Sequence, residues 1–365
     1  MTKIALCTEV LYPLYGVERR VYEMAKRLPE YGYDIELYSS TPNGFLDVKI
    51  NQVSKPTITR QPKRNYINCL QYTRNLVKLL CKSDCDIIDA NGHLSLLPCS
   101  IAGMKTKVPV VATIHDLYLL EWHYMYKGLG AFVGLPFELL VSQLPYRRVI
   151  TLNSSLVRRM KESLKMRSPV DVIPSGIDVK YIDTIRSEKK ENRVVYIGRL
   201  VPQKSVATLI RAFALAGRDA RLVIVGDGTE KEHLIRLSKK LGLKNVSFLP
   251  SFKRHEDAIK MIKSATVLVM PSKRECFGII PLEAMCSHTA VVSTRTEGPS
   301  DYILNEGNGF LVDVDDYVGM GNKIKLLLED RKLRNKITRN ARKTAELYDW
   351  NNIVKRIAQM YKELV

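Results

Sequence analysis

Short apolar runs alternate along the chain with longer segments in which apolar residues recur every three or four positions. The short runs are typical of buried strands in a parallel sheet, and the longer segments are typical of amphipathic helices. Strand-like runs occupy residues 3–8, 34–38, 86–90, 109–114, 148–152, 194–197, 221–225, 246–249, 266–270 and 289–293, and clear helical spacing occupies residues 66–81 and 206–215. Because strands alternate with helices, the pattern predicts an α/β protein built on parallel sheets.

The length predicts two domains, because 365 residues exceed the size at which a single core usually stops growing. A proline and a glycine, Pro174 and Gly176, interrupt the pattern near its midpoint, and a charged run follows at residues 186–193. We therefore place the first domain at residues 1–175 and the second at residues 176–345.

The composition is ordinary for a soluble globular protein, with 45% hydrophobic and 26% charged residues. No run approaches the roughly 18 uninterrupted apolar residues of a membrane span. The chain opens with a strand pattern instead of a signal peptide, so we expect a cytoplasmic protein. The seven cysteines form no CxxC pair and no Cys/His metal spacing, and reduced thiols are expected.

The net charge of +19 predicts attraction to an anion, such as a nucleotide, a diphosphate or an acidic membrane surface. The basic residues form small scattered groups without a zinc-finger or RNP signature, so no nucleic-acid partner is expected. An aromatic-rich stretch at residues 117–146, followed by a predicted basic helix at residues 155–167, has two interpretations. It could lie on an anionic membrane, peripherally on the cytoplasmic face, or it could pack inside the domain.

The most informative stretch follows the apolar run that ends at Met270. Pro281 is predicted to be the first helical residue, which places Glu283 in the first turn and the apolar Ile280 at the capping position. Free amides at this helix start, approached over Gly278, would suit a phosphate, and Glu275 and Glu283 would suit sugar hydroxyls. The alternative is that both glutamates are ordinary loop and first-turn charges.

Three further motifs lie at ends of predicted strands. Gly16 stands at the first loop-to-helix junction, where it either admits a ligand or simply forms the turn. His115 and Asp116 follow the strand at residues 109–114, at the sheet edge where ligands bind in open α/β folds, although a helix cap is the alternative. Arg199 and Lys204 flank a loop and could hold one anion, or they could be solvated surface charges.

With these motifs assembled, the chain resembles a retaining, nucleotide-sugar-dependent glycosyltransferase of family GT4, over nearly its whole length. The motifs that agree in order are Gly16-Val-Glu18, His115-Asp116, Gly198-Arg199-Leu through Lys204, and Glu275-x7-Glu283. The resemblance implies the GT-B fold, in which two Rossmann-like, doubly wound parallel-sheet domains face each other across a cleft. It also implies that residues 346–365 form a C-terminal helix that crosses back to pack on the first domain.

The resemblance further implies that the donor lies mainly on the second domain and the acceptor on the first. The residues implied in catalysis are Glu275, His115, Arg199 and Lys204. Those implied in donor binding are Gly16, Arg199, Lys204, Glu275, Phe277, Gly278, Ile279 and Glu283, with Asp116 as a further contact to acceptor or sugar. In this scheme Arg199 and Lys204 stabilise the departing diphosphate, Glu275 holds the transferred sugar, Glu283 holds the ribose, and His115 reaches the sugar from the first domain.

The expected reaction moves a hexose from a UDP- or GDP-linked sugar to a hydroxyl of a lipid-linked glycan, polysaccharide or glycolipid. No metal and no cofactor beyond the nucleotide sugar is expected. Two alternatives stay open, namely a sugar-nucleotide epimerase on the same fold and a non-catalytic nucleotide-sugar-binding protein. Tyr15 departs from the two consecutive glycines usual in the family, and the loops at residues 55–65 and 117–134 match no acceptor motif.

Overall fold

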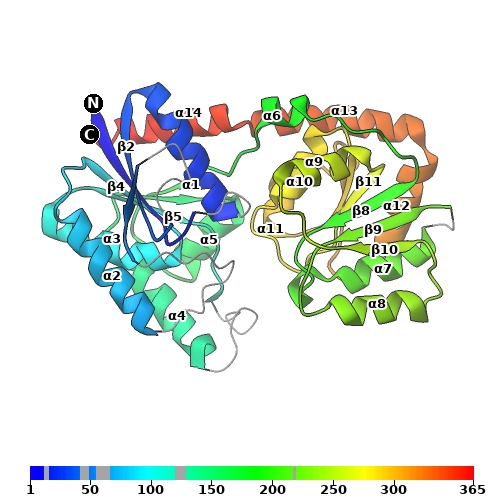
Figure 1. Ribbon diagram of the computed structural model, residues 1–365, viewed down its shortest axis with the longest axis horizontal. Coiled ribbons are helices and arrows are strands. Elements are labelled where there is room, and N and C mark those ends of the chain that lie inside the picture. The colour runs from blue at the N-terminus through cyan, green and yellow to red at the C-terminus, as the bar shows by residue number, and fades with distance from the viewer. Residues whose placement is uncertain (12–15, 42–48, 55–65, 120–128, 217–218) are drawn as a thin grey trace. The chain divides into compact units, whose positions relative to one another are not determined.

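The computed structural model describes residues 1–11, 16–41, 49–54, 66–119, 129–216 and 219–365. The chain divides into unit 1, which comprises Met1–Ser175 and Asn351–Val365, and unit 2, which comprises Gly176–Trp350. Each unit contains one parallel sheet with helices packed against it (Figure 1). The predicted α/β class with parallel sheets is thereby confirmed.

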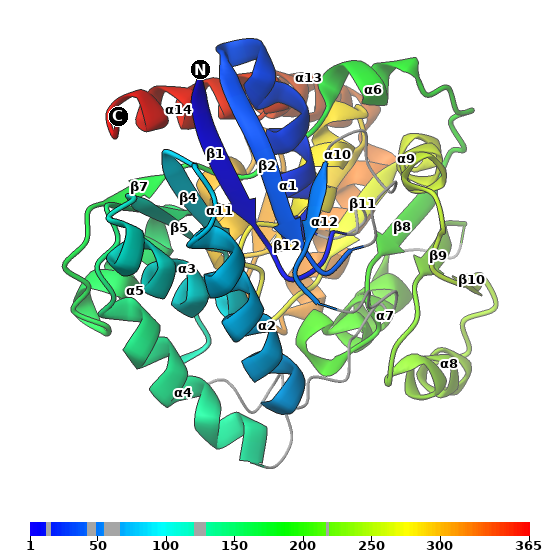
Figure 2. The ribbon, with the colours of Figure 1, turned by 60° about the vertical axis from the view of Figure 1, so that its left-hand side comes forward.

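Unit 1 has a seven-stranded sheet in the order β3-β2-β1-β4-β5-β6-β7. Its strands are β1 (Thr2–Cys7), β2 (Tyr33–Ser39), β3 (Ile50–Gln52), β4 (Ile87–Asn91), β5 (Val110–Ile114), β6 (Arg148–Thr151) and β7 (Val170–Val172). Its helices are α1 (Gly16–Arg27), α2 (Tyr66–Leu80), α3 (His93–Thr106), α4 (Leu129–Ser142), α5 (Ser154–Glu162) and most of α14 (Trp350–Lys362). Helices α2 and α3 pack side by side, as Figure 2 shows.

Unit 2 has a six-stranded sheet in the order β10-β9-β8-β11-β12-β13. Its strands are β8 (Arg193–Ile197), β9 (Arg221–Val225), β10 (Val246–Leu249), β11 (Val267–Met270), β12 (Ala290–Thr294) and β13 (Phe310–Val312). Its helices are α6 (Val179–Thr184), α7 (Val206–Leu215), α8 (Lys231–Lys240), α9 (His255–Ser264), α10 (Ile279–Cys286), α11 (Glu297–Tyr302), α12 (Tyr317–Glu329) and α13 (Arg331–Leu347).

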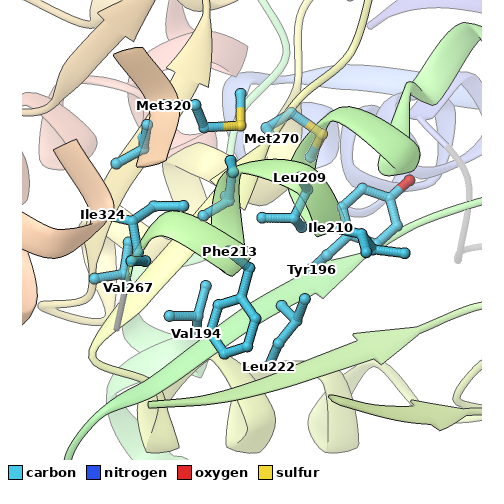
Figure 3. Close-up of a cluster of buried hydrophobic side chains, with 14 of the residues drawn as sticks. Val194, Tyr196, Leu209, Ile210, Phe213, Leu222, Val267, Met270, Met320 and Ile324 are labelled. Atoms are coloured by element: carbon cyan, nitrogen blue, oxygen red, sulfur yellow. The ribbon is translucent and has the colours of Figure 1, made fainter. Parts of the chain in front are cut away.

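The core of unit 2 lies between its sheet and helices α7 and α12 (Figure 3). Val194 and Val267 contribute from neighbouring strands, Phe213 from α7, and Met320 and Ile324 from α12, and all five side chains are buried. Fully burying such a side chain contributes roughly 1.5–3 kcal/mol. This packing fixes the positions of the strand ends from which the loops of unit 2 depart.

Three strands were not predicted from the sequence, namely β3, β7 and β13. Each contains only three residues, and each forms an outer edge of its sheet. A run of three residues is too short to show an alternation or an apolar block distinct from a loop. Their absence from the sequence-based prediction therefore reflects length and does not reflect a wrong pattern.

The aromatic-rich stretch at residues 117–146 is described only in part, because residues 120–128 lie outside the described residues. The predicted basic segment at residues 155–167 forms a helix only as far as Glu162. In the described part of the aromatic stretch, Val141 and Tyr146 are buried, whereas Leu139 and Leu140 are exposed. Both packing inside the unit and apolar exposure thus occur within this stretch.

A buried polar group fixes α14 to the sheet of unit 1. The hydroxyl of Tyr361 in α14 donates a hydrogen bond to the carboxylate of Asp89 in β4, and the Asn91 amide donates to the same carboxylate at 2.9 Å. The Tyr361 ring meets Tyr33 edge-on, with ring centroids 5.6 Å apart. Burial raises the pKa of Asp89 to about 6, although Tyr361, Arg20 and Asn91 each oppose that shift.

The raised pKa makes the stability of unit 1 depend on pH. Folded Asp89 keeps its proton up to about pH 6, whereas the unfolded carboxyl loses it near pH 4. Between those values unfolding releases a proton, so the contribution of Asp89 to stability falls as the pH rises. We expect the melting temperature of wild type to fall relative to that of Asp89→Asn from about pH 4 to about pH 7.

Asp84→Asn serves as the control for this measurement. Lys3 lowers the pKa of the exposed Asp84 carboxyl through a hydrogen bond, so the difference between wild type and Asp84→Asn should change mainly below about pH 4, with wild type losing stability as the pH falls. A pH-independent difference between wild type and Asp89→Asn would contradict the prediction.

Candidate functional site

Two loops of unit 2 meet where the order of its strands reverses. The reversal lies between β8 and β11, so the loop after Ile197 and the loop after Met270 leave the same edge of the sheet on diverging courses. The backbone amide of Lys273 donates to the carbonyl of Gln203 at 2.9 Å and joins the two loops. In open α/β sheets, ligands bind beyond the carboxyl ends of strands at such a point.

Helix α11 supports the loop from Glu275 to Gly278 through two hydrogen bonds and a ring contact. The Gly298 amide donates to the Glu275 carbonyl at 2.9 Å, and the Tyr302 hydroxyl donates to the Gly278 carbonyl at 2.7 Å. The buried ring of Phe277 meets Tyr302 edge-on, with centroids 5.9 Å apart. Sequence reasoning missed Gly298 and Tyr302, because neither belongs to a spacing that marks a site.

The prediction that α10 begins at Pro281 is wrong. The helix begins at Ile279, and Gly278 occupies the capping position with a left-handed φ of 78°. Glycine adopts that conformation without steric cost, so the chain turns into the helix earlier than the proline suggested. Pro281 is tolerated as the third helical residue because its nitrogen would have no partner within the helix.

The earlier helix start changes the interpretation of Glu283, which becomes the fifth residue of α10 and lies outside its first turn. Glu283 is therefore not the ordinary first-turn charge that the sequence left as an alternative. Within the described part of the chain, no side chain caps the helix, so the amides at Ile279 and Ile280 form a positive helix end. The feature that suggested a phosphate site is present, shifted by two residues.

Lys204 and Glu275 form an ion pair across the two loops, with Nζ 2.5 Å from Oε2. Their side chains are only 15% and 16% exposed, so solvent screens the pair less than a surface salt bridge. Ser205 holds the end of the lysine loop, because its Oγ donates to Asp315 at 3.0 Å. Within the described residues, Oε1 of Glu275 makes no hydrogen bond.

Arg199 is exposed and precedes Lys204 in the loop that follows Ile197. Its carbonyl accepts a hydrogen bond from the Tyr196 hydroxyl at 2.9 Å, which fixes its backbone. In the part of the chain that the structure describes, its guanidinium makes no hydrogen bond or ion pair, so it is available for an anion.

The turn at Gly226 and Gly228 supports this loop. A Cβ atom at Gly226 would lie 1.9 Å from the Gly198 carbonyl oxygen, and one at Gly228 would lie 2.2 Å from that of Leu200. Both glycines also have positive φ angles, of 151° and 158°. The two glycines therefore let the turn pack directly on the backbone that carries Arg199.

Glu283 pairs with a histidine that the sequence analysis missed. Oε1 of Glu283 lies 2.6 Å from Nε2 of His255, the first residue of α9. The carboxylate is nearly buried, at 7% exposure for the residue. His255 lies 28 positions before Glu283 and follows no recognisable motif, so only the fold brings the two together.

Comparisons with known proteins identify the family of the chain. Residues 15–181 match the family described as Glycosyltransferase Family 4, and residues 180–344 match the family described as Glycosyl transferases group 1. The chain belongs to the family-4 glycosyltransferases.

Among curated relatives, an uncharacterized glycosyltransferase of Methanocaldococcus jannaschii is 34% identical over 50% of this chain and 48% of its own length. This chain thus spans about half the length of that relative. A second uncharacterized glycosyltransferase of the same organism is 24% identical over 98% of both chains.

Two solved structures share the fold over essentially the whole chain. Sucrose-phosphate synthase from Thermosynechococcus elongatus is 20% identical, with a TM-score of 0.85 over 100% of this chain and 99% of its own. Anabaena HepE, in complex with UDP and glucose, is also 20% identical, with a TM-score of 0.79 over 100% of both chains. At these identities the likeness establishes the GT-B fold of this glycosyltransferase.

The remaining predicted residues of the glycosyltransferase belong to unit 1. Gly16 is the exposed first residue of α1, and its neighbour Tyr15 lies outside the described residues. His115 follows β5 and is buried, and its burial together with the charges of Arg20 and His93 holds its pKa well below the usual range. Its imidazole is therefore neutral at pH 7. Asp116 Oδ1 accepts from the next backbone amide at 2.8 Å, which is a local turn contact.

The unit 2 residues of the motif group together, whereas His115 and Asp116 are described with unit 1 alone. The acceptor-side loop predicted at residues 55–65 lies outside the described residues, as do residues 120–128 of the loop predicted at residues 117–134. The last six residues of that second predicted loop belong to α4 instead. Among the residues that are described, no cluster of three or more His, Cys, Asp or Glu side chains is arranged to hold a metal ion.

The support of the glutamate loop by α11 gives a testable prediction. In Gly298→Ala, the new Cβ would lie 2.3 Å from the Phe277 Cα and 2.5 Å from the Cys276 carbonyl oxygen. Backbone must move to relieve this overlap, at a cost of about 2 kcal/mol in the free energy of unfolding. We expect a lower denaturation midpoint together with a displaced Glu275 loop.

Gly307→Ala is the matched control, because its nearest contact would be 3.3 Å, to the side chain and backbone of Leu304. Equal stability of Gly298→Ala and Gly307→Ala in urea denaturation would contradict the packing argument.

Proposed function

We propose that this glycosyltransferase transfers a hexose, with retention of configuration and without a metal ion, from a nucleotide-diphosphate sugar to a hydroxyl acceptor. The ion pair of Lys204 and Glu275 at the strand-order reversal carries this proposal. The lysine ammonium has three donors, and one of them is used by the glutamate. A ligand with a phosphate on one side and a hydroxyl on the other can engage both groups.

The phosphate side of the proposed donor site consists of cations and amides. Arg199 and Lys204 supply two positive charges, and the uncapped start of α10 supplies amides with a positive helix end. Negative charge grows on the diphosphate as its bond to the sugar breaks. Groups placed to stabilise that charge bind the transition state more strongly than the bound donor, and they thereby lower the reaction barrier. In other enzymes a divalent cation has this role.

The sugar side consists of the two glutamates. We assign Glu275 to a hydroxyl of the transferred hexose, and Glu283 to the ribose of a UDP- or GDP-linked donor. Each carboxylate has one oxygen held by a protein group and one oxygen without a hydrogen-bond partner among the described residues. The complex of Anabaena HepE with UDP and glucose supports this class of ligand for the fold.

The reaction needs no separate base in this scheme. The bond between the anomeric carbon and the diphosphate oxygen breaks, and a bond to the acceptor oxygen forms on the same face of the sugar. The acceptor proton passes to the departing diphosphate oxygen. For His115 we propose a hydrogen bond to the sugar from a neutral imidazole, which fits its lowered pKa.

Substitutions at the ion pair test the catalytic proposal. We expect Lys204→Ala and Glu275→Ala each to lower turnover by about 10²–10³-fold, because each removes a group acting on the transition state. Turnover is measured as release of UDP or GDP from a panel of nucleotide sugars in the presence of glycan and lipid-linked acceptors, with circular dichroism to verify folding.

Lys323→Ala is the control, because it removes a partly exposed ion pair, with Glu306 at 3.0 Å, on another part of unit 2. Wild-type turnover in both ion-pair variants would contradict the proposal. Conversion of the donor to an isomeric nucleotide sugar without acceptor would identify an epimerase, and binding without any turnover would identify a binding protein.

We also propose that the protein associates peripherally with an anionic membrane surface. Its net charge is +19, and α5 presents Arg158 and Lys161 as exposed residues. Within the described residues, no helix combines the length and apolar character required to cross a bilayer.

Vesicle sedimentation tests the membrane proposal. We expect the protein to sediment with phosphatidylserine-containing vesicles at low ionic strength and to be released at about 0.5 M salt, where charge attraction is screened. Pure phosphatidylcholine vesicles are the control. Full recovery in the supernatant with the anionic vesicles at low salt would contradict the proposal.

A further inference from the structure

Both glutamates of the Glu275-x7-Glu283 motif are held in the same way in unit 2. Nζ of Lys204 donates a hydrogen bond to Oε2 of Glu275 at 2.5 Å, and Nε2 of His255 lies at hydrogen-bond distance, 2.6 Å, from Oε1 of Glu283. The Glu275-x7-Glu283 motif predicted a role for both glutamates, and the family resemblance implied a role for Lys204. Neither of them predicted a role for His255. His255 therefore needs an explanation of its own.

The histidine is fixed from two further directions. It is the first residue of α9, and its ring stacks on Tyr181 of α6, with centroids 5.8 Å apart and an angle of 14° between the planes. The carboxylate of Glu283 can only accept, so Nε2 carries the proton that joins them. Nδ1 is buried and, within the described residues, has no hydrogen-bond partner.

Among the residues that the structure describes, no other charged side chain forms a hydrogen bond or ion pair with Glu283. The neighbouring Arg254 points its guanidinium at Asp257, at 2.8 and 3.1 Å. Across the described chain, the imidazole of His255 is the sole hydrogen-bond partner of the Glu283 carboxylate. The second oxygen, Oε2, is left to accept from a ligand.

We infer that His255 is a positioning residue for the donor nucleotide, which holds Glu283 so that its free oxygen meets the ribose hydroxyls. This inference rests on the proposed function, in which Glu283 binds the ribose. A carboxylate fixed before binding loses less side-chain entropy when the ligand arrives. A hydrogen bond from the imidazole also draws off part of a negative charge that would otherwise oppose a nearby diphosphate.

The test compares nucleotides with and without ribose hydroxyls. Binding of UDP, GDP and their 2′,3′-dideoxy forms is measured by calorimetry on wild type, His255→Ala, Glu283→Ala and the double variant. We expect His255→Ala to weaken UDP or GDP about tenfold, the loss of one hydrogen bond to a charged group, and to change the dideoxy form by less than about twofold. In the Glu283→Ala background, His255→Ala should add nothing.

Two further variants separate positioning from folding. His255→Gln retains an N–H donor and should recover part of the affinity for the ribonucleotide. His233→Ala removes a similar but more exposed pair, between His233 and Glu230 at 3.1 Å, and should leave binding unchanged. In turnover, His255→Ala should raise the donor KM and leave kcat within about twofold, because the ribose is remote from the reacting bond.

The failures of the two proposals can be told apart. If wild type binds neither UDP nor GDP, both the proposed donor site and the positioning role of His255 are contradicted. If wild type binds but His255→Ala weakens the ribonucleotide and its dideoxy form equally, the donor site stands and the positioning role is overturned. A fall in kcat at unchanged KM would overturn it as well.

Discussion

The candidate site depends on a lysine and a glutamate that meet, 2.5 Å apart, where the loops after two neighbouring parallel strands diverge. Both side chains are only 15–16% exposed, so the ion pair compensates much of the hydration that each charge loses, and a bound ligand can replace that contact. Several features of unit 2 serve to bring the two side chains together. The strand order places the two loops at the same edge of the sheet. Asp315 and the turn at Gly226 support the loop that carries Lys204, and α11 supports the loop that carries Glu275.

Much of this arrangement could be predicted from the sequence. Long apolar strands and the helix at residues 206–215 have strong periodicity, and the structure reproduces that helix as α7. The motif glutamates, Arg199 and Lys204 follow strands, so the general rule for open sheets already placed them at one edge. Unit 2 brings them to that edge.

Other features could not be predicted, for identifiable physical reasons. The start of α10 depends on the left-handed conformation of Gly278. Pro281, three residues later, is also a common helix start and therefore led to a wrong prediction of the boundary. His255 reaches Glu283 only because α9 and α10 pack on one another, and no local spacing encodes that contact. The edge strands β3, β7 and β13 carry too few residues for a period.

The buried carboxylate of unit 1 differs from the carboxylates of unit 2 in how its oxygens are hydrogen-bonded. Both oxygens of the buried Asp89 carboxylate accept a hydrogen bond, one from Tyr361 and one from Asn91, and the Tyr361 bond ties the C-terminal helix to the sheet. The carboxylates of unit 2, in contrast, each keep one oxygen without a partner in the described chain. Satisfied polar groups specify a structure, whereas incompletely satisfied groups beside a helix end are suited to a ligand.

The most direct measurement of the central claim is the melting temperature of the purified protein with UDP, GDP, ADP and their sugar conjugates, in EDTA and in Mg²⁺. A ligand that binds only the folded state adds about 2.7 kcal/mol at one hundred times its Kd, which a melting curve resolves. We predict a rise with one nucleotide series that is retained in EDTA and absent in Lys204→Ala. No rise with any nucleotide, or a rise that requires Mg²⁺, would contradict a donor site built from cations and a helix end.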